Sequence, residues 1–355
     1  MKVAILTDTH IGVRNDNAAL LDFFKKFLDN TFFPTLKKYN VQTVLHGGDV
    51  FDRRKYVNIQ TAQRARVDFL DKLRPYNVHI IAGNHDVYLK SSNKINILDE
   101  LVADRYDNIK TYIDPTEVII HGKKILFLPW INDENREESM FAMRNSTANI
   151  CIGHLELKGF EMHKGSFSEY GQEADDFAKF DLVLSGHFHH KSTYKNINYL
   201  GSTHEMTWAD YNDIKGFHIL DLETLELEFI PNPYKLFQKI VYDDAGKEFE
   251  QIFNATNFSQ YKDCYVKIVV KTKTNPFWYD QFVQRLEDAG VAHLQAVDDH
   301  LNISLEVDED IINEAESTLD ILKKSIKGTG LKPETEASLE QLLHSLYVEA
   351  NLMQS

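Results

Sequence analysis

Three histidines follow an apolar run in the segment 184–202, LSGHFHHKSTYKNINYLGS. His187, His189 and His190 come just after the run 180–184 and a Ser-Gly turn, where a buried strand would reach the end of its sheet. In an extended turn, residues i and i+2 point the same way, so His187 and His189 can converge on one point. Two converging imidazoles indicate a metal site, although on this stretch alone a chance surface cluster is an equally good interpretation.

Four more predicted strand ends carry side chains of the kind that bind metals. Each has a carboxylate, an amide or an imidazole at or near a tight turn: Asp8-Thr-His10, Gly47-Gly48-Asp49-Val-Phe-Asp52, Gly83-Asn84-His85-Asp86 and Gly153-His154. In open α/β sheets, ligands collect outside the carboxyl ends of the strands. One such segment alone is ordinary turn chemistry. Five in one chain, nearly all flanked by glycine, favour a shared site.

The side-chain types limit the metal. Mixed carboxylate, amide and imidazole ligands suit Mn²⁺, iron or Zn²⁺ better than Ca²⁺. The chain has two cysteines, Cys151 and Cys264, and they are far apart in the sequence. The lack of a cysteine cluster argues against a structural zinc site.

The strands that would position these ends alternate with helical patterns through the first two thirds of the chain, which predicts an α/β fold. We expect eight strands, at 3–6, 43–46, 78–81, 118–120, 125–128, 149–152, 182–184 and 217–220. Helices are expected from the apolar spacing of Leu20 to Leu28 and over 59–73. A short turn at 122–124 predicts mixed rather than purely parallel sheets.

A composition shift after Pro231-Asn-Pro233 predicts a domain boundary. A compact α+β unit should follow, with strands at 265–270, 292–297 and 301–307 and helices near 279–289 and 309–324. The segment 328–333, GTGLKP, is typical of a flexible joint. The expected organisation is therefore a large domain at 1–233, a smaller one at 234–328, and a linker with one C-terminal helix at 329–355.

Composition narrows the class of protein. The chain has 355 residues, 43% of them hydrophobic, which is ample for a large domain and a smaller one. The N-terminus is too quickly polar for a signal peptide, and no run approaches membrane-spanning length, so a soluble, cytoplasmic protein is expected. The formal net charge of −15 argues against passive, charge-driven binding to nucleic acid. Nucleic acid stays open as a substrate if bound cations supply positive charge.

In this order, Asp-x-His, Gly-Asp-x-x-Asp, Gly-Asn-His-Asp, Gly-His and Gly-His-x-His resemble the metallophosphoesterase superfamily over roughly residues 1–230. Within it, the Gly-Asn-His-Asp motif, the segment Tyr199-Leu-Gly201-Ser202, the second domain and the C-terminal helix look most like the SbcD-type nuclease subunit of DNA-repair complexes. The segments 48–55, GDVFDRRK, and 153–160, GHLELKGF, look especially like its phage branch, the recombination endonuclease subunit. The resemblance implies a four-layer αββα sandwich with a smaller α+β cap domain and a C-terminal helix.

By motif position, the resemblance also implies seven metal ligands. One ion would be held by Asp8, His10 and His189. The other would be held by Asn84, His154 and His187, and Asp49 would bridge the two. His187 and His189 would thus serve different ions, and His190 would be only a surface neighbour. Two divalent ions, taken to be Mn²⁺, would activate water and neutralise charge on a phosphate.

Three further residues would be catalytic. His85 suits the acid that protonates the leaving 3′ oxygen. It would be a poor ligand itself, because its neighbour Asn84 is one and adjacent side chains diverge. Asp86 or Asp52 would orient the His85 ring.

The tail carries its own pattern. Ser338 and Gln341 are spaced as a capping box, and an apolar stripe follows at helical spacing, formed by Leu339, Leu342, Leu343, Leu346, Tyr347 and Ala350. This helix could fold back over its own domain. Alternatively it could dock onto another chain, and the resemblance favours the coiled-coil base of an SMC-like ATPase subunit.

The function implied by the resemblance is that of a Mn²⁺-dependent DNA exonuclease and endonuclease, the nuclease subunit of an SMC-like ATPase–nuclease complex in double-strand break repair and recombination. A homodimer is expected, in the host cytoplasm if the chain is phage-encoded. One alternative is a stand-alone phosphodiesterase for small phosphate esters, which would not need the cap and the tail. Another is a scaffold without chemistry, which would have no reason to retain every ligand position.

Overall fold

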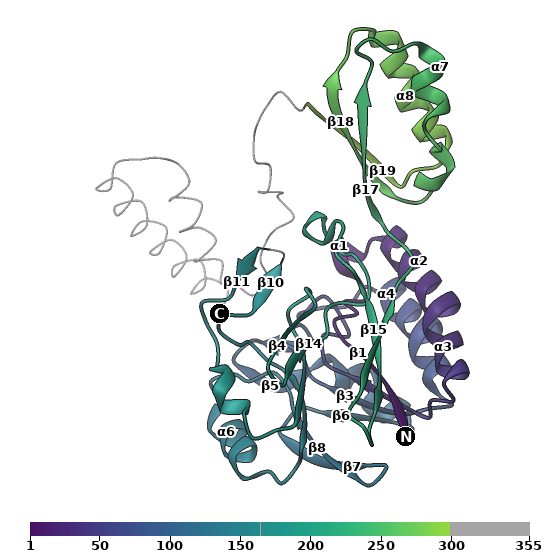
Figure 1. Cartoon of the computed structure of the whole chain (residues 1–355). Helices are drawn as coiled ribbons and strands as arrows, with labels where there is room; N and C mark the ends of the chain where they lie inside the picture. The colour runs from purple at the N-terminus through teal and green to yellow at the C-terminus, as the bar shows by residue number, and fades with distance from the viewer. Residues whose placement is uncertain (164, 299–355) are drawn as a thin grey trace, which may run out of the picture. The chain divides into compact units, whose positions relative to one another are not determined.

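Two six-stranded sheets form the centre of the fold (Figure 1). The computed structural model describes residues 1–163 and 165–298. The first sheet has the strand order β16-β15-β1-β2-β3-β6, and the second has the order β13-β14-β12-β9-β8-β7. Both sheets combine parallel and antiparallel neighbours, so the prediction of mixed sheets is confirmed.

All eight strands expected from the sequence in this region are present. The first sheet consists of β1 (Lys2–Leu6), β2 (Thr43–His46), β3 (Asn77–Ile81), β6 (Ile109–Tyr112), β15 (Gly216–Asp221) and β16 (Leu227–Pro231). The second consists of β7 (Thr116–Ile120), β8 (Lys123–Leu128), β9 (Ile150–His154), β12 (Leu182–Gly186), β13 (Ser192–Tyr194) and β14 (Ile197–Tyr199). The turn expected at 122–124 lies slightly earlier, because Ile120 pairs with Lys123 across it. The sequence did not reveal β6, β13, β14 and β16.

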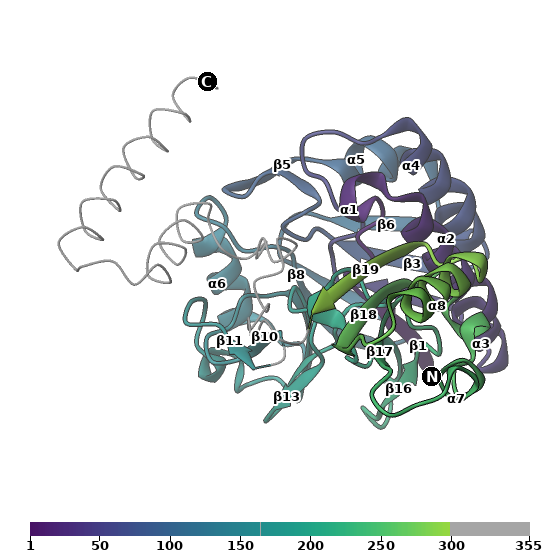
Figure 2. The same ribbon diagram turned by 90° about the horizontal axis from the view of Figure 1, so that it is seen from above.

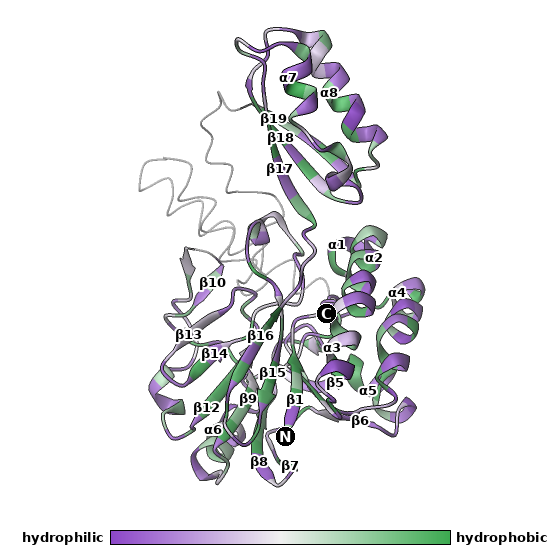
Figure 3. Ribbon diagram, turned by 45° about the vertical axis from the view of Figure 1, so that its right-hand side comes forward, coloured by the Kyte–Doolittle hydropathy of each residue, from purple (hydrophilic) through white to green (hydrophobic). Residues whose placement is uncertain are grey.

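An apolar layer joins the two sheets. Val3 and Ile5 of β1 belong to one buried cluster with residues of the second sheet such as Phe127. Because side chains alternate along a strand, Ala4 and Leu6 face the other way, into a second cluster with the helices. Figure 3 shows the resulting apolar colour along strands such as β12 and β15.

Helical segments cover the outer face of the first sheet. The side-chain oxygen of Asn17 caps α2 (Ala18–Phe27) by accepting the backbone N–H groups of Ala19 and Leu20. The chain continues through a π turn, η1 (Leu28–Phe32), into α3 (Phe33–Lys38). The helix predicted over 59–73 is one helical stretch of three kinds of turn, α4 (Ile59–Arg64), η2 (Ala65–Phe69) and η3 (Leu70–Leu73).

The other outer face carries α6 (Arg136–Asn145), on the side of the two sheets away from α2 and α3 (Figures 1 and 2). Helices, two stacked sheets and a further helix give the predicted four-layer αββα sandwich, which is confirmed. We call residues 1–231 the sandwich. No helix within the described ranges is long and apolar enough to cross a membrane.

Shorter elements complete the sandwich. Two hairpins stand outside the large sheets, β4 (Val87–Leu89) with β5 (Ser92–Asn96) and β10 (Glu161–His163) with β11 (Ser166–Phe167). The remaining helical turns are α1 (Val13–Asp16), α5 (Ile97–Leu101), η4 (Ala103–Arg105), η5 (Ala174–Phe177) and η6 (Trp208–Asp210).

A three-stranded sheet follows the sandwich. Its strands β17 (Phe237–Asp243), β18 (Tyr265–Thr272) and β19 (His293–Asp298) are all parallel. The connections carry α7 (Phe249–Asn254), η7 (Phe258–Tyr261) and α8 (Pro276–Asp288), which share an apolar cluster with the strands. The expected strand at 301–307, the helix at 309–324, the joint at 328–333 and the C-terminal helix lie outside the described residues. The boundaries at 233 and 328 stay predictions.

Candidate metal centre

The ligand-type residues of both sheets meet where their strands end. The backbone N–H of Asp8, after β1, donates to the carbonyl oxygen of Gly48, after β2, at 3.0 Å. The backbone N–H of His187, after β12, donates to Oδ1 of the same Asp8 at 3.1 Å. A backbone bond therefore joins two loops of the first sheet, and the Asp8 carboxylate joins them to the loop after β12 of the second sheet.

The first group of side chains is Asp8, His10 and His189, whose ligand atoms all lie within 4.8 Å of one another. The Nε2 atom of His10 lies 3.0 Å from Nε2 of His189 and 3.9 Å from Oδ1 of Asp8. These are the three residues that the family resemblance implies for one ion.

The second group centres on the amide oxygen of Asn84. This Oδ1 atom lies 2.9 Å from Nε2 of His154 and 2.8 Å from Nδ1 of His187. The carboxylate of Asp49 lies between the groups, with its Oδ2 atom 3.2 Å from Nε2 of His154 and 3.5 Å from Nε2 of His10. The structure thus brings all seven predicted ligands together, with Asp49 between the two groups.

The donor atoms fit divalent cations. The Nδ1–H of His154 donates to the carbonyl oxygen of Gly47 at 2.8 Å, which directs Nε2 toward the centre, as in metal-binding histidines generally. Among the described residues, none hydrogen-bonds the buried Nε2 atom of His187. Carboxylates, imidazoles and one amide form a donor set that suits Mn²⁺, iron or Zn²⁺.

The backbone at the centre is strained. Four predicted ligands have left-handed φ values, Asp8 at 51°, His10 at 38°, Asp49 at 56° and His187 at 88°. Each such residue costs about 1–3 kcal/mol and persists only where its surroundings hold it. Here a bond from the His10 N–H to the carbonyl oxygen of Asp49, 3.1 Å long, is one of the restraints.

Two glycines permit the close approach of these loops. A Cβ atom on Gly83 would lie 2.1 Å from Oδ1 of Asp49, and one on Gly48 would lie 2.6 Å from Nδ1 of His154. Gly48 also has a φ of 96°, which favours glycine. The glycines beside the ligands in the sequence therefore make room for the ligands themselves.

Burial and neighbouring charges set the protonation of the side chains at the centre. Burial favours neutral Asp49, but the charges of His154 and His85 outweigh it and hold the pKa of Asp49 well below its usual value. Burial alone would lower the pKa of His154, but the charge of Asp49 raises that pKa to about 9. Burial and the charge of His154 hold the pKa of His187 well below its usual value. A cation at His154 must displace the proton of this ring, so metal affinity should fall at low pH.

Asp52 contacts two rings of the site. Its backbone carbonyl oxygen lies 2.5 Å from Nδ1 of His85, and its Oδ1 atom lies 3.3 Å from Nδ1 of His10. The His85 Nδ1–H therefore donates to a carbonyl oxygen, which fixes the orientation of that ring. Asp52 thus contacts both His85 and the predicted ligand His10.

The carboxylate of Asp86 is engaged with the backbone. At 2.8 to 3.2 Å it accepts the N–H groups of Gly83, Asp49, Val50 and Phe51. Burial raises the pKa of Asp86 to about 7, and the charge of Asp49 adds to this. Asp86 thus holds the loop of the bridging Asp49, and a direct role toward His85 stays a prediction.

Replacing Asp86 with alanine is expected to destabilise the protein by about 3 kcal/mol or more, because four buried N–H groups lose their acceptor and each unsatisfied group costs about 1–3 kcal/mol. Urea unfolding of the metal-free protein, followed by circular dichroism, measures this. Asp107→Ala, at an exposed position, is the matched control and should change stability by less than about 0.5 kcal/mol. Equal stabilities for the two variants would contradict this role of Asp86.

Three neighbours of the site were not predicted. Buried Lys215 donates from Nζ to the carbonyl oxygen of His189 at 2.8 Å and pairs with Asp210 at 2.7 Å. The ring of Trp130 lies 5.2 Å from that of His187, and the ring of His163 lies 6.4 Å from that of His189. Trp130 follows the predicted strand 125–128 and so shares the strand-end signal of the predicted ligands. Sequence spacing offers no signal for Lys215 and His163, since only the fold brings them to the site.

His190 is more than the surface neighbour expected from the sequence. Its Nδ1 atom lies 3.1 Å from Oδ1 of Asp213, and its Nε2 atom lies 3.5 Å from Oε2 of Glu161. The ring therefore links the β10–β11 hairpin to the loop before β15, next to the ligand His189.

Comparisons with known proteins identify the family of the chain. Residues 1–191 match the calcineurin-like phosphoesterase family. The chain is 32% identical over 357 residues to exonuclease subunit 1 of Enterobacteria phage T4, a match that covers 99% of both chains. It is 24% identical over 304 residues to the SbcD subunit of the SbcCD nuclease of Staphylococcus epidermidis, covering 74% of this chain and 78% of that protein. It is 26% identical over 273 residues to the DNA double-strand break repair protein Mre11 of Methanosarcina mazei, covering 72% of this chain and 42% of that protein. The chain therefore belongs to the calcineurin-like phosphoesterase family, in its SbcD-type nuclease branch.

Proposed function

We propose that this metal-dependent phosphodiesterase is a DNA nuclease of recombination and repair that works with two divalent ions, which we take to be Mn²⁺. The observation that carries the proposal is the place of the Asp49 carboxylate between two groups of ligand atoms, 3.2 Å from His154 and 3.5 Å from His10. The relatives named as nuclease or exonuclease subunits support DNA as the substrate.

The residues divide the work of phosphodiester hydrolysis. Asp8, His10 and His189 would hold one ion, Asn84, His154 and His187 the other, and Asp49 both. When bound, two such ions lower the pKa of water and offset charge on the phosphate. His85 protonates the leaving 3′ oxygen from Nε2, because its Nδ1–H is held by the carbonyl oxygen of Asp52. Asp86 keeps the Asp49 loop in place through its bonds to the backbone N–H groups.

The negative charge of the protein favours a role for a partner chain in DNA binding. With a formal net charge of −15, the chain alone should bind DNA weakly. An ATPase partner would then supply the additional affinity for DNA. The T4 and Staphylococcus epidermidis relatives are themselves named as subunits. We assign ATPase binding to the C-terminal helix. A homodimer and a cytoplasmic location, in the host if the chain is phage-encoded, stay predictions.

Deleting residues 331–355 should leave Mn²⁺-dependent cleavage of short single strands intact and abolish association with the ATPase. The reason is that the apolar stripe of the tail, which includes Leu339, Leu342 and Leu346, would lie in a groove of the partner. Co-purification and ATP-stimulated duplex degradation measure the loss. A point variant with Leu342→Asp and Leu346→Asp in the full-length chain is the matched test. Unchanged affinity for the ATPase, or misfolding of the truncated chain, would contradict the assignment.

One assay tests the proposed function directly. Labelled single- and double-stranded DNA are incubated with the protein and Mn²⁺ or Mg²⁺, with and without the ATPase, beside bis(4-nitrophenyl) phosphate as a small diester. We expect DNA cleavage that requires metal and a kcat/KM for DNA well above that for the small diester. Hydrolysis of the small diester alone would favour a stand-alone phosphodiesterase and contradict the proposal.

A further inference from the structure

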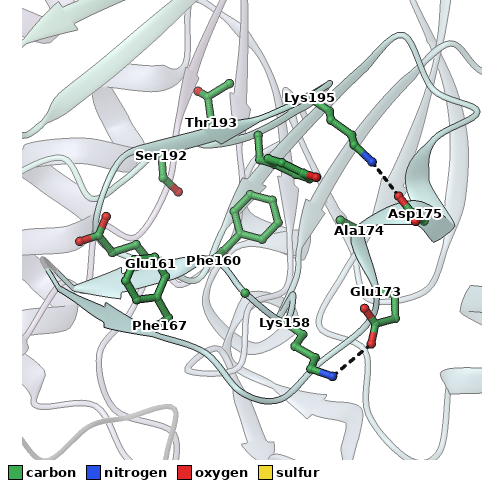
Figure 4. Close-up of a pocket in the computed structure, with 12 residues that line it drawn as sticks. Lys158, Phe160, Glu161, Phe167, Glu173, Ala174, Asp175, Ser192, Thr193 and Lys195 are labelled. Atoms are coloured by element: carbon green, nitrogen blue, oxygen red, sulfur yellow. Dashed lines mark hydrogen bonds and ion pairs between the residues drawn. The ribbon is translucent and has the colours of Figure 1, made fainter.

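A hollow of about 540 Å³ lies between the β10–β11 hairpin and strand β13 (Figure 4). Phe160 and Phe167 of the hairpin region and all three residues of β13, Ser192–Tyr194, are among those that line it. Its size falls in the range of sites for small molecules or single chemical groups of larger ones, about 300–1,000 Å³. The proposed chemistry of the metal centre leaves this hollow without a role.

Three aromatic rings contribute to its walls, those of Phe160, Phe167 and Tyr194. Phe160 is only 5% exposed, and its ring lies 4.9 Å from that of buried Tyr199 and 6.1 Å from that of Tyr194. Phe167 and Tyr194, in contrast, are 59% and 53% exposed. Two large rings kept at the surface beside a hollow offer flat apolar faces on which a planar group can stack.

The charged side chains that line the hollow determine which chemical groups it can bind. Lys158 pairs with Glu173 at 3.5 Å, and Lys195 pairs with Asp175 at 2.9 Å, both at exposed positions (Figure 4). With Glu161, the lining holds two lysines and three carboxylates, which disfavours a phosphate inside. Carboxylates do accept hydrogen bonds from the amino groups of nucleobases. Exposed ion pairs are worth little, so both lysines can turn to phosphates outside the hollow.

Strand β10 connects the hollow to the metal centre. Glu161, at its start, lines the hollow, and His163, at its end, has its ring 6.4 Å from that of His189. Two residues of extended strand span roughly 7 Å. The carboxylate of Glu161 also lies 3.5 Å from Nε2 of His190. A strand of DNA with one phosphate at the ions would therefore pass close to the hollow.

We propose that the hollow receives one unpaired nucleobase of a single-stranded DNA substrate. The base stacks on Phe167 and Tyr194, its amino edge faces Glu161, and its backbone stays outside, near Lys158 and Lys195. The inference rests on the proposed nuclease function and adds a base subsite to it. A peptide strand added to the edge of β13 is the competing occupant, but three residues give a short edge for such pairing.

The test uses the full-length chain with Phe167→Ala and Tyr194→Ala, singly and together. Phe141→Ala is the matched control, because Phe141 is 69% exposed on α6 and is not among the residues that line the hollow. The substrates are single-stranded oligonucleotides in which one abasic site is moved along the strand, and bis(4-nitrophenyl) phosphate, which has no base. We expect the double variant to raise KM for the unmodified strand about tenfold and to leave hydrolysis of the small diester unchanged.

Position along the strand makes the test specific. In the unaltered protein, one abasic position should raise KM about tenfold, and the double variant should be insensitive to that position. An unchanged KM in the double variant would overturn the inference. Unchanged cleavage of single strands together with loss of ATPase binding would overturn it as well, in favour of a peptide surface.

Binding separates this inference from the proposed function. Oligonucleotides that carry 2-aminopurine at successive positions report stacking as a loss of fluorescence, whether or not they are cleaved. Quenching at one position, absent in the double variant and present in Phe141→Ala, supports the hollow even if no diester is hydrolysed. If the fluorescence is the same at every position in the unaltered protein, the double variant and Phe141→Ala, the base subsite is overturned, even if the chain proves to be a nuclease.

Discussion

Replacing Asp49 with alanine is expected to abolish both metal binding and DNA cleavage. The Asp49 carboxylate is shared by the two ligand groups, with Oδ2 3.2 Å from Nε2 of His154 and 3.5 Å from Nε2 of His10. Loss of residues that merely orient ligands costs about 10- to 100-fold in metal affinity or activity, so loss of a shared ligand should exceed this range. Calorimetric titration with Mn²⁺ and a cleavage assay measure the two effects.

The matched control is Asp68→Ala. Asp68 is also a buried carboxylate, but it pairs with Arg64 on the helical stretch outside the centre. This variant should bind Mn²⁺ as the unaltered protein does, although it should be less stable. If Asp49→Ala bound two ions with unaltered affinity, the bridging role would be wrong.

A His85→Ala variant, in contrast, should lose about a hundredfold or more in cleavage while it still binds two ions. The reason is that His85 contacts the predicted bridging residue Asp49 through its backbone. Its backbone N–H donates to Oδ1 of Asp49 at 2.7 Å, and alanine retains this bond. Only the ring, held by the carbonyl oxygen of Asp52, is lost.

Two substrates with different leaving groups test whether His85 acts as a general acid or has only a structural role. A 4-nitrophenyl ester leaves as a weak base and needs little protonation, so His85→Ala should hydrolyse it nearly as fast as the unaltered protein does. Cleavage of DNA, whose leaving group is a 3′ alkoxide, should show the full loss of rate. His121→Ala, in the turn between β7 and β8, is the control and should leave both rates unchanged. An equal loss on both substrates would contradict the acid role.

The parts predictable from the sequence are those with a local signal. Strands such as β1 and β8 contain continuous apolar runs because both of their faces are buried. The loops that carry the predicted ligands are recognisable in the sequence by their glycines. Only glycine fits against Asp49, at Gly83, and against His154, at Gly48, so the sequence motif and the geometry of the site have the same steric cause. This local coupling explains why all seven predicted ligands meet in the structure.

The parts that could not be predicted depend on distant contacts. β13 and β14 have three residues each, too few for a periodic pattern, and they exist because β14 pairs with β12. Lys215 looks like any surface lysine until the fold brings it to Asp210 and to the carbonyl oxygen of His189. The left-handed backbone of Asp8 and His10 is likewise imposed by bonds to residues about 40 positions away, at Gly48 and Asp49.

The decisive measurement for a two-ion centre is the number of Mn²⁺ ions bound per chain, determined by calorimetry on the same samples whose DNA cleavage is measured. A centre bridged by Asp49 predicts two ions with cleavage in the unaltered protein, two ions without cleavage in His85→Ala, and fewer than two ions without cleavage in Asp49→Ala. Full cleavage with a single ion bound would contradict it. So would a His85→Ala variant unable to bind Mn²⁺ beside an Asp49→Ala variant that binds it normally.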